Sequence, residues 1–306
     1  MVKLSDREFI IAMVLSTISS ILMGAFFIIA LKGIDISNGS AFFTFASAVE
    51  MALVIGYMIF EHKKIAFPKK KYILNSLIFT TATILFLLLM TKTNVIVLSE
   101  IFTINILIFI LFQVLHHRNI VNRVMVLKLF AGGVMIILAI MLAYGFEGIS
   151  LSLLVFAIAM VITLLYGVSN YLFSHNSKHS YTKSNLIFWL VLFQLLVSSV
   201  TTSIFNFSVA LTPNIIFYGL LGGVVLFLST IIMIYSYHKI KDYTPASNLV
   251  GTSVLFVLSE TDVVFISLFY GMFVGALSIY TILSLGLLVL AVYIISSVEE
   301  KIKVSP

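Results

Sequence analysis

Hydrophobic residues fill ten long stretches of this chain, separated by short segments that hold most of the charged residues. The stretches cover residues 9–31, 40–60, 72–90, 95–115, 124–143, 151–173, 186–206, 215–237, 246–270 and 274–296. Most of them approach the ~20 residues that an α-helix needs to cross ~30 Å of hydrocarbon. Strands of a membrane barrel would be about half as long and would alternate in polarity, which these stretches do not. The pattern therefore predicts an all-α, polytopic membrane protein with ten transmembrane helices.

The basic residues gather in or around every second gap between these stretches and at the two ends of the chain. Of the 18 lysines and arginines, all except Lys32 and Lys92 follow this rule, namely Lys3, Arg7, Lys63, Lys64, Lys69, Lys70, Lys71, Arg118, Arg123, Lys128, Lys178, Lys183, Lys239, Lys241, Lys301 and Lys303. Short cytoplasmic loops of membrane proteins are enriched in basic residues. The alternation predicts a multi-pass protein of the cell membrane with its N- and C-termini in the cytoplasm.

The ten stretches divide into two sets of five. Because five is odd, the second set must enter the membrane in the opposite orientation to the first, which predicts two inverted repeats over residues 1–145 and 146–306. Met23-Gly24 in the first repeat corresponds to Tyr166-Gly167 in the second, and Lys32 and His175 each follow nine residues later. Inverted repeats suit alternating access, because two similar halves can exchange inward-open and outward-open arrangements.

One region allows two interpretations. Residues 263–296 form a nearly unbroken apolar run, with Gly271 and Gly275 as its natural break. The preceding polar residues 259–262 lie either inside the ninth helix or in a surface turn after a shorter one. We favour the helix, because residues 246–258 alone are short for a span. Both interpretations leave the termini on the same side.

Composition narrows the function classes. The chain is 61% hydrophobic and 10% charged, with a mean hydropathy of +1.18, which excludes a soluble globular domain. Its net charge of +6 lies in separate loops rather than on one face, so we expect no nucleic-acid partner. The sequence has no Cys, which excludes disulfides and thiolate metal sites. It also has no Gly-x-x-x-x-Gly-Lys-Ser/Thr phosphate-binding run, which disfavours an ATP-driven pump. We also expect no enzyme activity, because no nucleophile and base lie on adjacent turns.

We expect no cofactor and no metal site. All six histidines lie near the ends of predicted helices, and none pairs with a carboxylate at metal-ligand spacing. The adjacent residues His116 and His117 would point about 100° apart on a helix.

Four carboxylates lie inside the predicted helices and are the main candidates for a substrate or proton site: Glu50, Glu100, Glu260 and Asp262. A charge at the bilayer centre costs about 2.5–3.5 kcal/mol on insertion scales, so such residues usually face a cavity or a partner. The fourth and ninth helices are equivalent under the repeat, so Glu100 and Glu260 would approach one central site from two sides. Glu260 and Asp262 lie about 200° apart around a helix, so only one of them can face that site.

Each acid also has a structural alternative. Glu100 would lie near the headgroups and close to Lys92, and Asp262 would be solvated in a surface turn. Glu50 would be a neutral core acid bonded to a hydroxyl group such as that of Ser47.

Uncharged polar residues complete the candidate lining of a cavity. These are Ser20, Thr103, Asn105, Tyr166, Asn170 and Asn248. The asparagines are costly against lipid and are expected to face protein or water. The alternative is that these side chains join helices to one another, since small and polar residues allow close helix packing in membranes.

Several segments resemble the EamA-like family of the drug/metabolite transporters. The first stretch contains Met23-Gly24 followed by Lys32, where the family has a Trp-Gly pair and a Lys at the helix end. The second contains Phe45-Ala46-Ser47-Ala48-Val49-Glu50, with Glu50 near a position where Arg is common. His116-His117-Arg118 stands where the family often has Gly-Glu-Arg, and Thr244-Pro245-Ala246-Ser247 resembles the entry into its ninth helix. The resemblance implies ten helices around a central cavity and export or exchange of small metabolites.

We therefore expect a secondary transporter, an exporter or exchanger of a small organic metabolite or drug-like solute. Its partners would be a cationic or zwitterionic substrate and membrane lipid, and it would act as a monomer or homodimer. Glu260 and Glu100 would bind the substrate or carry a coupling proton. The alternative is a receptor or assembly protein that does not transport, which would have a closed bundle without a central cavity.

Overall fold

The computed structural model describes residues 7–36, 39–68, 70–90, 104–119, 123–143, 153–179, 183–204, 213–240, 245–259 and 279–296. The regular structure in these ranges is helical: α1 (Arg7–Ile36), α2 (Gly39–Phe60), α3 (Lys70–Met90), α5 (Asn105–His116), α6 (Arg123–Ala143), α7 (Leu153–His179), α8 (Lys183–Ile204), α9 (Pro213–Lys239), α10 (Pro245–Ser259) and α12 (Ile279–Ser296). The all-helical fold is therefore confirmed for the described residues.

Six of the described helices are long and apolar enough to cross a membrane: α1, α2, α3, α7, α8 and α9. Large hydrophobic side chains cover their outer faces. For example, Ile59 on α2 is 69% exposed and Leu154 on α7 is 70% exposed. Such faces are unfavourable in water and favourable against lipid chains. The composition and the structure together identify a membrane protein.

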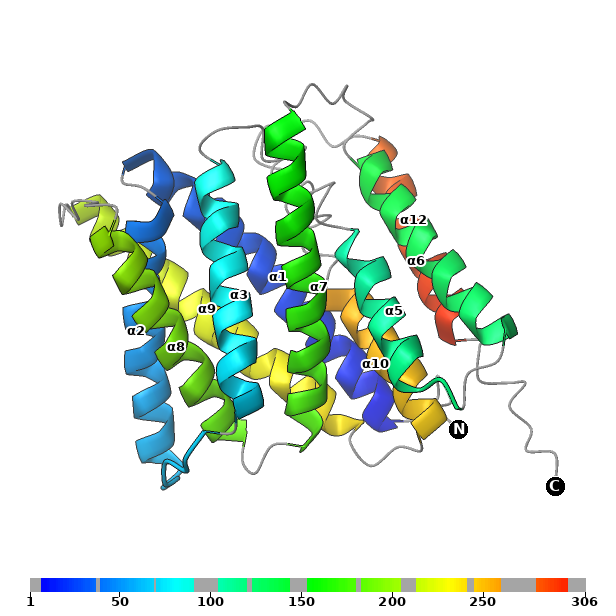
Figure 1. Ribbon diagram of the computed structural model, residues 1–306, viewed down its shortest axis with the longest axis horizontal. Coiled ribbons are helices and arrows are strands. Elements are labelled where there is room, and N and C mark those ends of the chain that lie inside the picture. Colours follow the sequence, from blue (N-terminus) through cyan, green and yellow to red (C-terminus); the bar gives the residue numbers. More distant parts are fainter. Residues whose placement is uncertain are drawn as a thin grey trace.

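The helices form an elongated bundle with a helix pair at each end (Figure 1). α2 and α8 lie at one end, α6 and α12 lie at the other, and α1, α3, α7 and α9 lie between them. Within this bundle α1 packs on α9 and α10, α3 packs on α7 and α8, and α2 packs on α8 and α9. α5 packs on α6 and α7, and α10 packs on α12.

Side-chain contacts give the direction in which neighbouring helices run. On α1 and α9, Ser19 bonds to Ser229 and Ser16 to Met233, so the two helices are antiparallel. On α2 and α9, the hydroxyl of Thr230 contacts Glu50 and Tyr235 contacts Tyr57, so these helices are parallel. The same comparison makes α3 and α7 antiparallel (Thr83–Tyr166, Asn75–Ser169) and α2 and α8 antiparallel (Ser40–Thr202, Glu50–Gln194).

Glycines allow α9 to lie very close to α2. A Cβ atom built on Gly223 would lie 2.6 Å from the backbone oxygen of Ala46 and 2.6 Å from Cβ of Val49. One turn earlier, the face of Gly219 is covered by the ring of Phe45. Small residues four apart are a common basis of close helix packing in membranes. This contact sets the distance at which polar side chains further along α2 and α9 meet.

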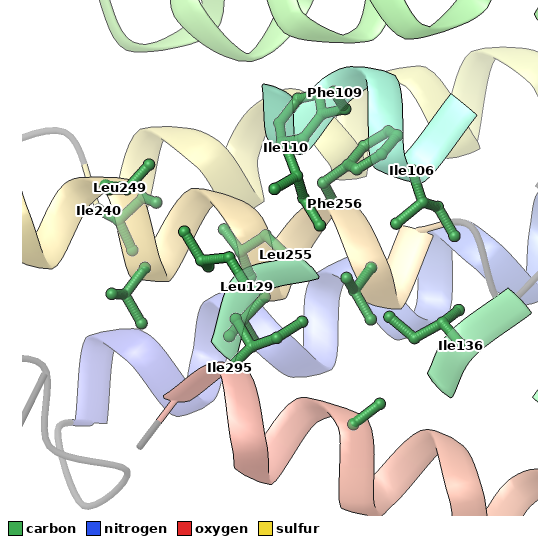
Figure 2. Close-up of a cluster of buried hydrophobic side chains, with 14 of the residues drawn as sticks. Ile106, Phe109, Ile110, Leu129, Ile136, Ile240, Leu249, Leu255, Phe256 and Ile295 are labelled. Carbon is green, nitrogen blue, oxygen red and sulfur yellow. The ribbon is translucent and has the colours of Figure 1, made fainter. Parts of the chain in front are cut away.

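A large apolar cluster joins α1, α5, α6, α9, α10 and α12 (Figure 2). At its centre Phe109 of α5 stacks on Phe256 of α10, with ring centroids 3.8 Å apart. Ile106, Ile110 and Leu255 lie around them and are fully buried. The cluster holds the short helices α5 and α10 against each other.

The helix limits differ from the predicted ones at two places that matter. α1 continues to Ile36, five residues beyond the predicted end, so Lys32 is an exposed residue on a helix and not part of a loop. The prediction ended the helix at Leu31 because Lys32 was taken as the start of a polar gap; the lysine side chain instead reaches outward from a continuing helix. α7 likewise continues to His179. Residues 95–103 and 260–278, including the region with two interpretations, lie outside the described residues.

We predict that Gly223→Ala destabilises the protein. The added methyl group would collide with the α2 backbone, which cannot rotate away as a side chain can, so α9 would have to move outward. Overpacking of this kind costs about 1–3 kcal/mol. Thermal unfolding of the detergent-purified protein should show a lower midpoint. Gly56→Ala is the matched control, since a Cβ on Gly56 meets nothing within 4 Å. Equal midpoints for the two variants would contradict the close α2–α9 contact.

Candidate functional site

Glu50 is a buried carboxylate at the middle of an apolar helix. It is the twelfth residue of the 22-residue helix α2, and its side chain is 1% exposed. Gln194, which is 3% exposed, is likewise the twelfth residue of the 22-residue helix α8. The contact between Glu50 and Gln194 brings the midpoints of these antiparallel helices together, and each midpoint lies roughly 16 Å from the helix ends at 1.5 Å per residue. Two polar side chains therefore meet at the centre of two apolar helices.

Hydrogen bonds link Glu50 to two other helices. The Nε2 group of Gln194 donates to Glu50 Oε2 at 2.9 Å and to Ser47 Oγ at 2.9 Å. The hydroxyl of Thr230, on α9, donates to Glu50 Oε1 at 3.2 Å. We call Ser47, Glu50, Gln194 and Thr230 the Glu50 cluster. Both carboxylate oxygens of Glu50 thus accept a bond from the protein.

The local sequence explains why these groups can meet. Ser47 and Glu50 are three residues apart, so they lie on the same face of α2. That face is directed at α8, where one amide nitrogen carries two hydrogens and can serve both acceptors. Burying a carboxyl without partners in such an apolar place would cost several kcal/mol. The cluster removes most of this cost by hydrogen bonding.

Further polar contacts continue along α2 on either side of the cluster. Toward the start of the helix, Ser40 and Thr44 contact the hydroxyl of Thr202 on α8 at 2.8 Å and 3.0 Å. Toward the end, the hydroxyl groups of Tyr57 and Tyr235 lie 3.1 Å apart. α2 is thus joined to its neighbours by polar contacts along most of its length.

A second polar group lies around α7, nearer the middle of the bundle. The hydroxyl of Tyr166 donates to Thr83 on α3 at 3.0 Å, and the hydroxyl of Ser169 donates to Asn75 Oδ1 at 2.8 Å. On the side facing α5, Gly167 lies against the start of that helix: a Cβ there would be 3.2 Å from the backbone oxygen of Asn105. Polar side chains of α3 and α7 therefore meet along one section of α7, and the start of α5 packs against the same section.

The structure brings some of the predicted site residues together and separates others. Tyr166, Asn170 and Asn105 belong to the group around α7, and Ser20 is a buried residue of α1 next to Ser19, which bonds to Ser229 on α9. Glu50 is in a different place, between α2, α8 and α9. Glu100, Thr103, Glu260 and Asp262, and the side chain of Asn248, lie outside the described residues.

The surroundings of Glu50 agree with the structural alternative, in which a buried acid is bonded to a hydroxyl group. That hydroxyl group belongs to Thr230. Ser47 bonds to Gln194 instead. Sequence reasoning missed Gln194 and Thr230. Gln194 carried a usable signal: the chain has two glutamines, Gln113 and Gln194, and both lie within apolar stretches where an amide is costly without a partner. Thr230 gave no such signal, because single threonines are frequent in membrane helices.

We predict that Glu50→Ala lowers stability more than Glu50→Gln. Alanine leaves the Thr230 hydroxyl without its acceptor and takes away one of the two acceptors of the Gln194 amide, at about 1–3 kcal/mol per buried polar group left unpaired. Glutamine fills the same volume, accepts from Gln194 and donates to Thr230. Chemical unfolding in mixed micelles measures the difference. The control is Glu61→Ala, at an exposed position just after α2. An alanine effect no larger than that of the control would contradict the bonding role of Glu50.

Comparison with known proteins establishes the fold and nothing further. No family model matches the chain, and no curated protein matches it. Among solved structures, one protein crystal structure is similar, with a TM-score of 0.74 and 10% sequence identity over 96% of this chain and 99% of that chain. At this identity the likeness shows a shared fold over almost the whole length of both chains.

Proposed function

We propose that this protein is a secondary transporter that moves a small organic solute across the cell membrane by alternating access. The observation that carries the proposal is a correspondence between helix contacts in the two parts of the chain. If α1, α2, α3, α5 and α6 correspond in order to α7, α8, α9, α10 and α12, almost every packed pair has a counterpart. The resemblance to EamA-like drug/metabolite transporters agrees with this arrangement.

Three contacts have a counterpart in the other repeat. The contact between α1 and α9 corresponds to that between α7 and α3, and the contact between α2 and α9 corresponds to that between α8 and α3. The contact between α1 and α10 corresponds to that between α7 and α5. The remaining end pairs, α2 with α8 and α6 with α12, each join two corresponding helices. The directions also agree: α1–α9 and α3–α7 are antiparallel. α5 and α7 run parallel (Ile108–Gly167, Gln113–Ser174), as do α1 and α10 (Phe9–Gly251, Ser16–Leu255). This supports two repeats of opposite orientation over residues 1–145 and 146–306.

Such an arrangement places the substrate between the repeats, near the middle of the membrane. We propose that Tyr166 and Asn170 of α7 and Asn105 of α5 line that position. We propose Glu260 and Glu100 as the ionisable groups that bind a cationic or zwitterionic solute or carry a coupling proton. Glu50 has another role in this proposal. Its two oxygens are already bonded to Gln194 and Thr230, so it joins helices and does not contact the substrate.

The proposed orientation can be tested with single cysteines, because the chain has no Cys of its own. Lys63→Cys lies in a gap proposed to be cytoplasmic, and Asn214→Cys lies in a gap proposed to be external; both positions are exposed. In intact cells a membrane-impermeant maleimide should label only Asn214→Cys. Lys63→Cys should react after the membrane is permeabilised. Labelling of both positions from one side would overturn the topology.

Transport itself can be tested in proteoliposomes. A thermal-shift screen of amino acids, nucleosides and amines selects the solute, and its flux is then measured with and without a pH gradient. We expect Glu260→Gln to lower the flux at least tenfold and Glu50→Gln to leave it within about twofold, because only the first would remove a charge from the substrate site. Wild-type flux in Glu260→Gln would remove Glu260 from the mechanism. Loss of flux in a stably folded Glu50→Gln would overturn the structural role of Glu50.

A further inference from the structure

A group of aromatic and imidazole side chains lies where α5 ends beside α7. His116 is the last residue of α5, and its ring lies 5.4 Å from the ring of His175 on α7, measured between centroids. Tyr171, one turn before His175, contacts His116 through its hydroxyl at 2.8 Å. His116 is exposed and His175 is partly buried. The sequence places these residues 59 positions apart, and only the parallel packing of α5 and α7 brings them to one level.

We propose that His116 and His175 form a binding site for a divalent transition-metal ion such as Zn²⁺, Ni²⁺ or Cu²⁺. Imidazole is the ligand that these ions share, whereas Mg²⁺ and Ca²⁺ prefer oxygen. Two imidazoles bound to one tetrahedral Zn²⁺, with Zn–N distances of about 2.0–2.1 Å, have ring centroids about 5 Å apart. The ring centroids of His116 and His175 lie 5.4 Å apart, close to this separation.

The hydrogen bond between His116 and Tyr171 would orient the His116 ring for such a role. Metal-binding histidines almost always use their other ring nitrogen in a hydrogen bond, which selects the tautomer and orients the ring. Here the Nδ1 atom of His116 lies 2.8 Å from the Tyr171 hydroxyl. When that hydroxyl accepts a bond from Nδ1–H, the lone pair of Nε2 is available to the ion. Tyr171 is itself held in place by stacking on Phe112, with centroids 5.6 Å apart.

The site has two protein ligands, and water completes its coordination. Among the described residues no group of three or more His, Asp and Glu side chains is arranged to hold a metal. The sequence gives no reason to expect this site, because His116 and His175 lie 59 residues apart. His117 also lies near His116, with ring centroids 4.7 Å apart, but it is the next residue of the same chain segment. The second ligand comes from another helix, so a bound ion would join α5 to α7.

A consequence for transport rests on the proposed function. His116 belongs to residues 1–145 and His175 to residues 146–306, so a bound ion would connect the two proposed repeats. It would slow any movement that separates α5 from α7 at this end. The binding of the ion does not depend on that consequence and can be tested separately.

The test measures Zn²⁺ binding to the full-length protein in detergent, with any purification tag removed. We expect saturable binding of one ion per chain, weakened at least tenfold by His116→Ala and by His175→Ala. Tyr171→Phe should weaken it about tenfold, since loss of an outer partner typically costs 10–100-fold. His62→Asn is the matched control: His62 is exposed, and Asn tolerates its positive φ of 51°. Its affinity should equal that of the wild type.

Electron paramagnetic resonance of bound Cu²⁺ gives a second measurement, with coupling to two imidazole nitrogens in the wild type and to one in His175→Ala. No saturable binding to the wild type, or wild-type affinity in His175→Ala, would overturn the site. Zn²⁺ binding with no effect on flux would leave the site intact and overturn only its consequence for transport. Size-exclusion profiles of the variants confirm that they are folded, as expected for changes at the helix surface.

Discussion

The bundle has to hold its helices together in surroundings that are as apolar as the helix surfaces themselves. Burying another leucine between two helices gains little when lipid offers the same contact. Two kinds of contact between α2 and its neighbours do not depend on such burial, namely close backbone approach and polar pairing. Gly223 supplies the first by admitting the α2 backbone, and the Glu50 cluster supplies the second. The glycine contact and the Glu50–Thr230 bond both join α2 to α9, so the glycine contact brings Thr230 close enough to Glu50 to donate its hydrogen.

Hydropathy predicted the helices well because every backbone group in a membrane must be bonded within its own helix or barrel. The described helices fall on the predicted stretches, and α2 begins and ends within one residue of its prediction. Errors occurred where charged side chains were taken as the ends of helices. Lys32 did not end α1, because a long side chain can carry its charge outward while its backbone remains helical.

The candidate site was less predictable, because its partners come from different helices. Glu50 was identifiable as a costly residue, but its bonds to Gln194 and Thr230 depend on which faces of α8 and α9 are directed at α2. His116 and His175 illustrate the same limit. Each looks like an ordinary residue at a helix end, and their closeness follows only from the parallel packing of α5 and α7. A local sequence pattern shows the period of a helix and which side chains are costly to bury. Predicting a site also requires the rotation of each helix about its own axis, because that rotation decides which faces meet.

The central position of the Glu50–Gln194 contact has a geometric consequence. α2 and α8 extend equally far on both sides of it, so a rotation of one helix against the other about this point displaces the two ends by equal and opposite amounts. With arms of roughly 16 Å, a rotation of about 10° moves each end by about 3 Å. An off-centre contact would displace one end of the helix more than the other. A contact at the midpoint moves the two ends alike, and the hydroxyl contacts of Ser40 and Thr44 with Thr202, nearer one end, are the bonds between α2 and α8 that such a rotation would break first.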